Sequence, residues 1–182
     1  MINLFQPSLG DEELALIKDV FTSNWLGKGN GVKDFESKFA TSLSSNSESF
    51  LSTTSCTEAI FLSAKLFNFS KSDEIIVPTI SFPSVGSAVI ESGAKIVFCD
   101  VDKHSLNVRA EDIQKAISNK TKAVYITHYG GIPCEMDEII ELCSQNKILV
   151  IEDSACAVRS FYKGKACGTI GDMGMWSFDA MK

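Results

Sequence analysis

Short apolar segments alternate with amphipathic ones along most of the 182-residue chain. Runs of apolar residues rich in Val and Ile predict strands buried on both faces, and apolar residues that recur every three or four positions predict helices. The predicted strands are 74–77, 95–99, 123–126 and 148–152, after a short strand that closes at Phe50-Leu51. The predicted helices are 57–67, 84–92, 110–117 and 136–145. This alternation predicts βαβ units in a three-layer α/β/α domain with a mainly parallel sheet.

The N-terminal segment has a purely helical pattern. A helix is predicted over 8–22, with Ser8 as its cap and acidic residues in its first turn. A second helix is predicted over 32–43, and the glycine-rich stretch 27–31 predicts a flexible loop between the two. Three apolar residues of the first helix fall on one face: Leu14, Ile17 and Phe21.

Composition excludes several classes of protein. The chain is 45% hydrophobic and 22% charged, as is usual for a globular domain. Its net charge of -6 argues against nucleic-acid binding, but backbone N–H groups can still hold a small anion. No apolar run approaches the roughly 18 residues of a membrane span, and residues 1–10 do not resemble a signal peptide. We therefore expect a cytoplasmic protein without a membrane partner.

The six cysteines and two histidines give little support for a metal site. No two cysteines form a C-x-x-C pair, which argues against zinc-ribbon and thioredoxin-like sites. We expect no bound metal, and we expect the cysteines to be buried, reduced thiols.

Two segments that follow predicted strands carry candidate binding residues. Ser55-Cys56-Thr57-Glu58-Ala59 opens a helix, so its hydroxyls and amides form either an anion site or an ordinary helix cap. Pro78 to Ser84 places Phe82 just after the next strand. This ring could stack on a flat heterocycle or simply belong to the core.

Two further segments carry candidate chemistry. The apolar strand 148–152 leads into Glu152-Asp153, and a carboxylate at a strand end can pair with a protonated ring nitrogen or act as a solvated turn acid. The glycine-rich segment 168–174 permits tight turns before a short strand, after which Ser177 offers a hydroxyl for a phosphate. Lys182 follows five residues later, and a lysine amine forms a Schiff base with an aldehyde cofactor. Alone, each of these residues has an ordinary structural explanation, but their order suits one cofactor.

Together these motifs resemble the DegT/DnrJ/EryC1/StrS family of sugar aminotransferases, which use pyridoxal 5'-phosphate (PLP) and have the fold of type I PLP-dependent transferases. The resemblance covers nearly the whole chain. Ser81 and Pro83-Ser84 depart slightly from the family pattern. The matching segments are 24–36, Ser55 to Ala59, Pro78 to Ser84, Gly93 to Asp102, His128 to Pro133, Glu152 to Ala157 and Ser177 to Lys182.

The resemblance implies a role for each matched residue. Lys182 would be the catalytic lysine that carries PLP and moves the proton, and Asp153 would hold the pyridinium nitrogen. Phe82 would stack on the ring. The phosphate would be contacted by Cys56, Thr57 and Ser177. The family usually has Gln or His beside the cofactor's phenolic oxygen at the position of Cys156, so the cysteine is a departure from the family pattern.

The implied reaction is ping-pong transamination of a nucleotide-linked keto sugar, with glutamate as the usual amino donor. The product would be an amino sugar for surface polysaccharide, such as lipopolysaccharide, or for a natural product. The family is homodimeric with shared active sites. Members are about twice this length, so we expect 1–182 to be the N-terminal segment plus most of the PLP-binding large domain, without the C-terminal small domain.

Three alternatives remain. A PLP-dependent sugar dehydratase of the same family would typically carry His in place of Lys182. Another fold-type I enzyme, such as a cysteine desulfurase or a decarboxylase, often has His directly before the lysine, where this chain has Met181. A non-catalytic regulatory relative would not need Lys182 and Asp153.

Overall fold

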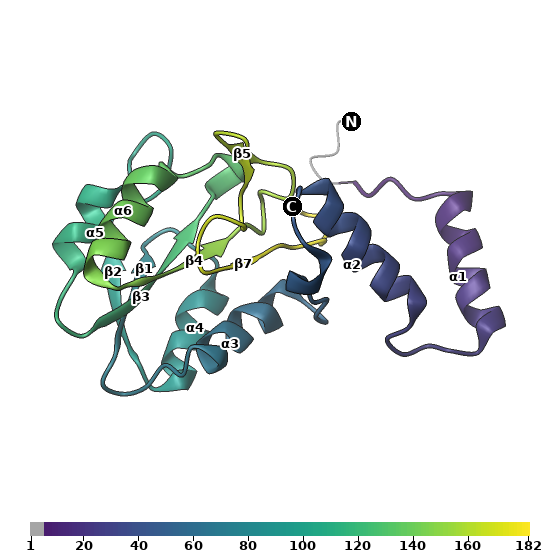
Figure 1. Cartoon of the computed structure of the whole chain (residues 1–182), viewed down its shortest axis with the longest axis horizontal. Coiled ribbons are helices and arrows are strands. Elements are labelled where there is room, and N and C mark those ends of the chain that lie inside the picture. Colours follow the sequence, from purple (N-terminus) through teal and green to yellow (C-terminus); the bar gives the residue numbers. More distant parts are fainter. Residues whose placement is uncertain (1–5) are drawn as a thin grey trace. The chain divides into compact units, whose positions relative to one another are not determined.

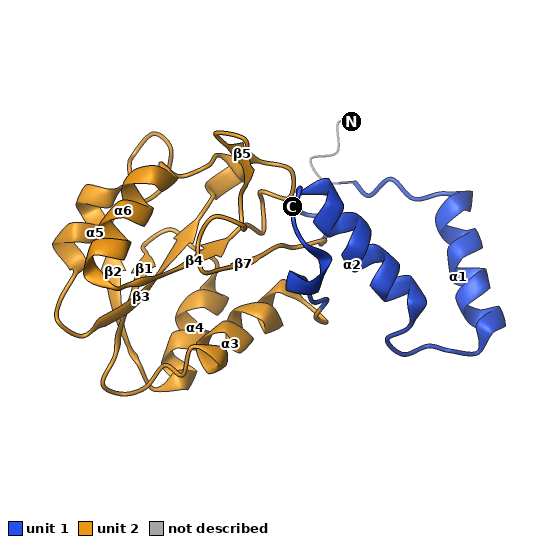
Figure 2. Ribbon diagram, in the orientation of Figure 1, with its two compact units in different colours: residues 1–52, 179–182 blue, residues 53–178 orange. Residues whose placement is uncertain are grey.

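The computed structural model describes residues 6–182, which form two compact units. The larger unit is Thr53–Phe178, and the smaller one combines the segment up to Ser52 with Asp179–Lys182 (Figure 2). None of the helices in the described part of the chain is long and apolar enough to cross a membrane.

A five-stranded parallel sheet forms the centre of the larger unit, with strand order β2-β1-β3-β4-β7. Every neighbouring pair in this sheet is parallel, as the alternation of strands and helices predicted. The strands predicted at 74–77, 95–99, 123–126 and 148–152 agree with the observed ones to within two residues at each end. The strands are β1 (Glu74–Pro78), β2 (Lys95–Cys99), β3 (Thr121–Thr127), β4 (Leu149–Asp153) and β7 (Met173–Met175).

Helices cover both faces of this sheet and complete the three-layer α/β/α architecture (Figure 1). They are α3 (Cys56–Leu66), α4 (Pro83–Ser92), α5 (Ala110–Ala116) and α6 (Met136–Asn146). Alternate strand residues point to opposite faces, so Ile75 and Ile151 pack with α3 and α4, while Ile76 and Val150 pack with α5 and α6. Both faces are therefore apolar, which explains the continuous hydrophobic runs in the sequence.

Local signals set the ends of these helices. Ser55 caps α3 by accepting a hydrogen bond from the Glu58 amide at 3.1 Å. Pro83 occupies the first turn of α4, where its missing N–H has no helical partner to lose. Gly93 ends α4 in a left-handed conformation, with φ of 84°.

The smaller unit corrects several expectations. The first helix, α1 (Asp11–Ser23), is preceded by Gly10 and not capped by Ser8: the Gly10 amide donates to the Glu13 carboxylate at 2.6 Å. Its expected apolar face, which includes Leu14, is exposed, and α1 buries no residue. The second helix, α2 (Asn30–Ser42), takes the last two residues of the expected 27–31 loop into its first turn.

The expected strand at Phe50-Leu51 was wrong. A short 3-10 helix, Ser47–Ser49, precedes this dipeptide, and no strand of the described sheets includes it. The Phe50 ring instead packs edge-on against Phe39, with 5.6 Å between the ring centroids. The Phe39 ring also stacks on Phe35 at 5.9 Å, so aromatic packing decides the conformation here.

The sequence analysis missed a small antiparallel hairpin of β5 (Phe161–Tyr162) and β6 (Lys165–Ala166). Its turn contains Lys163 and Gly164, both with positive φ. A pattern of two residues per strand is too short to show alternation, so the hydrophobic pattern contained no signal for it.

Gly174 in β7 packs directly against the backbone of Gly168, and a Cβ at Gly174 would overlap the Gly168 carbonyl group. We expect Gly174→Ala to lower the free energy of unfolding by about 1–3 kcal/mol, because backbone cannot move aside as a side chain can. Urea denaturation measures this. The control is Gly86→Ala, whose Cβ would lie 3.5 Å from Ile96 in ordinary contact and should be neutral or stabilising. Equal stability of both variants would contradict the prediction.

Candidate functional site

The candidate site lies at the carboxyl edge of the parallel sheet. β1 ends at Pro78, β3 at Thr127, β4 at Asp153 and β7 at Met175. Because parallel strands end at the same edge, the residues that follow these ends come together, and this is where ligands bind in open α/β sheets.

The N-terminus of α3 contributes Cys56 and Thr57 to this edge. The chain leaves the C-terminus of α3 and enters β1 at the opposite edge, so α3 runs antiparallel to the strands. Its first-turn N–H groups and the positive end of its dipole therefore point towards the carboxyl edge. The Glu58 carboxylate accepts hydrogen bonds from the Thr54 hydroxyl and amide, and these bonds lower its pKa.

Phe82 is the residue that precedes α4, and 57% of its surface is exposed. The alternative that Phe82 belongs to the core is therefore wrong. An exposed aromatic ring at the carboxyl edge has the chemistry of a stacking surface for a flat heterocycle.

Asp153 is the last residue of β4 and is only 3% exposed. Its Oδ1 atom accepts a hydrogen bond from the Ala155 amide at 3.1 Å. The alternation along β4 directs its side chain to the face where Ile151 packs with α3 and α4. The carboxyl group is thus buried on the same side of the sheet as the N-terminus of α3, and it is not a solvated turn acid.

The remaining predicted residues differ in their surroundings. Ser177 follows β7 by two residues and is buried, whereas Cys156 is exposed in the loop after β4. Lys182 is exposed and belongs to the smaller unit. The larger unit therefore collects Cys56, Thr57, Phe82, Asp153, Cys156 and Ser177.

The cysteines correct one expectation. All six are free thiols, but Cys156 is exposed and Cys56 is half-buried, so burial holds only for the other four. Burial raises the pKa of Cys134 to about 12 and those of Cys99, Cys143 and Cys167 to about 11. These thiols stay protonated and unreactive at neutral pH. Residues 6–182 contain no group of three or more residues able to hold a metal ion.

A buried pair of His128 and Glu152 lies beside the site and was missed as a functional feature. Both side chains are fully buried, and His128 Nε2 lies 2.9 Å from Glu152 Oε2. His128 Nδ1 accepts the Cys134 amide at 3.1 Å, which places the ring proton on Nε2, where it donates to Glu152. Glu152 and Asp153 are adjacent in β4, and the side chains of neighbouring strand residues point to opposite faces of the sheet. The sequence therefore contained a signal that the Glu152 carboxylate lies on the other face and has a partner of its own there.

The Glu152 carboxylate also anchors the loop that leads into β7. It accepts the amides of Gly168, Ile170 and Gly171 at 2.6–2.7 Å. Burial alone would raise its pKa, but the hydrogen bonds from His128 and from the backbone amides lower it below the ordinary 4.5. The carboxylate is therefore ionised at neutral pH, and it ties β4 to the loop before Ser177.

Several buried hydroxyl groups at the carboxyl edge have no hydrogen-bond partner among the described residues. They belong to Ser81, Ser84, Thr127 and Ser154. Buried polar groups are normally paired, so unpartnered hydroxyl groups at this edge fit a site that receives a polar ligand.

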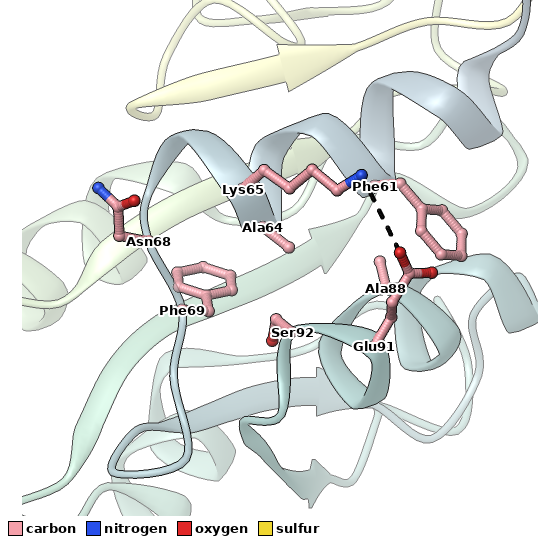
Figure 3. A pocket seen from close by; sticks show the side chains of 8 residues that line it. All are labelled: Phe61, Ala64, Lys65, Asn68, Phe69, Ala88, Glu91 and Ser92. Atoms are coloured by element: carbon pink, nitrogen blue, oxygen red, sulfur yellow. Dashed lines mark ion pairs between the residues drawn. The ribbon is translucent and has the colours of Figure 1, made fainter.

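A separate surface pocket lies between the C-terminal halves of α3 and α4, towards the opposite edge of the sheet (Figure 3). Lys65 and Glu91 approach each other to 4.0 Å across it. Its other lining residues are Phe61, Ala64, Asn68, Phe69, Ala88 and Ser92. None of the predicted site residues lines this pocket.

A doubly wound α/β unit with a buried acid and a helix N-terminus at its carboxyl edge belongs to the class of folds that bind ligands at that edge. The profile of the DegT/DnrJ/EryC1/StrS aminotransferase family matches residues 7–182, and the chain belongs to this family.

Individual relatives agree with this assignment. The chain is 47% identical over its full length to a dTDP-4-dehydro-2,3,6-trideoxy-D-glucose 4-aminotransferase of Saccharopolyspora spinosa, of which it covers 47%. It superposes on the aminotransferase TlmJ from Streptoalloteichus hindustanus with a TM-score of 0.96 and 48% identity, covering 100% of this chain and 50% of that one. The chain thus spans about half the length of these relatives.

A PLP-containing structure is also similar. The E. coli GDP-4-keto-6-deoxy-D-mannose-3-dehydratase with bound hydrated PLP superposes with a TM-score of 0.87 and 29% identity, over 97% of this chain and 47% of that one. PLP carries a ring nitrogen, a phenolic oxygen and a phosphate. The buried acid, the α3 N-terminus and the buried hydroxyl groups of this chain fit those groups.

Proposed function

We propose that the full-length protein uses PLP to transfer an amino group from a donor amino acid to a nucleotide-linked keto sugar. The observation that carries this proposal is the buried Asp153 carboxyl group at the same sheet edge, and on the same face, as the N-terminus of α3. The carboxyl group can pair with a protonated ring nitrogen, and the N-terminus of the helix can bind a phosphate.

Each predicted residue then has a definite task. Asp153 holds the ring nitrogen, and Phe82 stacks on the ring. Cys56, through its backbone, and the hydroxyl groups of Thr57 and Ser177 bind the phosphate. When bound, PLP supplies an electron sink that acidifies the C–H bond of the amino donor.

Lys182 is proposed to carry PLP covalently and to move the proton, while Cys156 lies near the phenolic oxygen. A lysine amine performs both tasks because it is nucleophilic and basic once it has lost its own proton. The chain 1–182 would then supply most of the PLP-binding large domain.

The substrate proposal rests on the Saccharopolyspora spinosa relative, whose name specifies amination at C4 of a dTDP-linked keto sugar. We propose a nucleotide-linked 4-keto deoxysugar as acceptor and glutamate as donor. A cytoplasmic homodimer with shared active sites, acting in the biosynthesis of polysaccharide or natural-product sugars, is the corresponding biological setting.

A sugar dehydratase is the second candidate, favoured by the similarity to the E. coli dehydratase. Lys182 is the residue that argues against it, because dehydratases of this family typically carry His there. Incubation with a keto sugar and glutamate separates the two: an aminotransferase yields an amino sugar and 2-oxoglutarate, and a dehydratase yields a deoxy sugar.

We expect the full-length protein with PLP to absorb in the roughly 400–430 nm range, as a lysine-bound PLP does. Borohydride reduction followed by peptide mass spectrometry should place phosphopyridoxyl on Lys182. Added glutamate should bleach the band. A colourless protein with unmodified Lys182 would instead identify a non-catalytic relative.

A further inference from the structure

The hydroxyl group of Thr127 is buried at the carboxyl edge and has no hydrogen-bond partner among residues 6–182. Thr127 is the last residue of β3 and pairs directly with Asp153 of β4 in the register of the sheet. Ala123 and Tyr125 of the same strand pack with α3 and α4, so the alternation places the Thr127 side chain on the face that also carries Asp153.

The order of strands defines the neighbours of Asp153 along this edge. β4 lies between β3 and β7, so Thr127 stands on one side of Asp153 and Ser177, just after β7, stands on the other. Neighbouring strands are about 4.8 Å apart. A flat ring whose nitrogen contacts Asp153 therefore reaches both neighbours with its two flanks.

The chemistry of PLP distinguishes these two flanks. One flank carries the phosphate arm, and the other carries the methyl group and the 3-oxygen. The proposed phosphate contacts, Ser177 and the N-terminus of α3, lie on the β7 side, because α3 packs against β7. The flank with the 3-oxygen then faces β3 and Thr127.

We propose that the Thr127 hydroxyl group donates a hydrogen bond to the 3-oxygen of PLP, an inference that rests on the proposed function. This oxygen carries negative charge in the lysine-bound cofactor, so it needs a donor. A thiol is a weak donor, and the thiol at Cys156 is exposed. Thr127, at the end of β3, supplies the stronger donor.

The other buried hydroxyl groups are less suited to this role. Ser154 directly follows Asp153, so its side chain turns away from that face, and it lies close to Gly168. Ser81 and Ser84 follow β1, which is one strand further from Asp153 than β3 is.

The test measures the affinity of the full-length apoprotein for PLP and for 3-deoxypyridoxal 5'-phosphate by absorbance titration. Thr127→Val keeps the shape of the side chain and removes the donor. We expect it to weaken PLP binding roughly 10-fold to 100-fold, as loss of a hydrogen bond to a charged group does. Binding of the 3-deoxy analogue should change by less than about 2-fold, because that analogue has no oxygen to bond.

Thr127→Ser keeps the hydroxyl group and should bind PLP like the wild type. A Thr127→Val penalty of the same size for both ligands would overturn the proposal, since the hydroxyl group would then act on the protein or on another part of the ring. An unchanged PLP affinity would overturn it as well. Failure of the wild type to bind PLP would instead overturn the proposed function from which this inference starts.

Discussion

Replacing Glu152 with glutamine is expected to lower the free energy of unfolding at pH 7 by about 3 kcal/mol or more, because hydrogen bonds to a charged group contribute about 1.5–3 kcal/mol each. The carboxylate accepts hydrogen bonds from His128 and from the amides of Gly168, Ile170 and Gly171. Every one of these groups is a donor, so the site is built for an acceptor with two oxygens.

The glutamine side chain cannot satisfy this site. Its NH₂ group would face either His128 Nε2 and the Gly168 amide or the amides of Ile170 and Gly171. A change of tautomer at His128 does not relieve the conflict, because Nδ1 already accepts the Cys134 amide. An unsatisfied buried donor results in either orientation.

The pH dependence gives a second, independent readout. The hydrogen bonds hold the pKa of folded Glu152 below the ordinary 4.5. A lowered pKa stabilises the folded state fully above the unfolded value and loses that contribution as the pH falls through the folded value. The difference in unfolding free energy between the wild type and Glu152→Gln should therefore shrink below about pH 4.5.

Urea denaturation of the full-length protein at pH 7 and at pH 4 measures both effects. The matched control is Glu138→Gln, an exposed carboxylate of α6, which should leave stability within about 0.5 kcal/mol of the wild type. Equal stability of Glu152→Gln and the wild type at pH 7 would show that the carboxylate is not the organising group of this loop.

The sheet and its helices were predictable from the sequence because each strand is buried on both faces. Such strands appear as uninterrupted apolar runs, and the predicted strand 95–99 matches the observed β2 at both ends. Ends set by proline or glycine were also predictable, as at Gly93. At Phe50 the local pattern predicted a strand that the packing of aromatic rings does not allow, and in the short hairpin of β5 and β6 the local pattern gave no signal.

The sequence named the residues of the candidate site but not their environments. The resemblance located Asp153 and Phe82, but only the structure shows that the carboxyl group is buried and that the ring is exposed. The partners of Glu152 come from residues 128, 168, 170 and 171, and no periodic pattern connects positions so distant in the chain. The unpartnered hydroxyl group of Thr127 likewise exists only as a consequence of strand register.

Replacing Lys182 with alanine is expected to have the largest effect on activity. The proposed role combines covalent attachment of PLP with proton transfer, and proton transfer by a positioned side chain alone contributes about 10²–10⁴-fold to a rate. We expect the single-turnover formation of 2-oxoglutarate from glutamate by the PLP-loaded variant to slow by at least about 10²-fold. The control is Lys103→Ala, an exposed lysine in the loop after β2, which should leave this rate unchanged.

Lys182→Arg separates the charge of the side chain from its chemistry. Arginine keeps the positive charge, but its guanidinium group does not lose its proton at working pH, so it can neither attach the cofactor nor act as a base. If Lys182 performs the proposed chemistry, the arginine variant should be as slow as the alanine variant. Activity near that of the wild type in Lys182→Arg would mean that only positive charge is needed at this position, and the aminotransferase mechanism would have to rest on another residue.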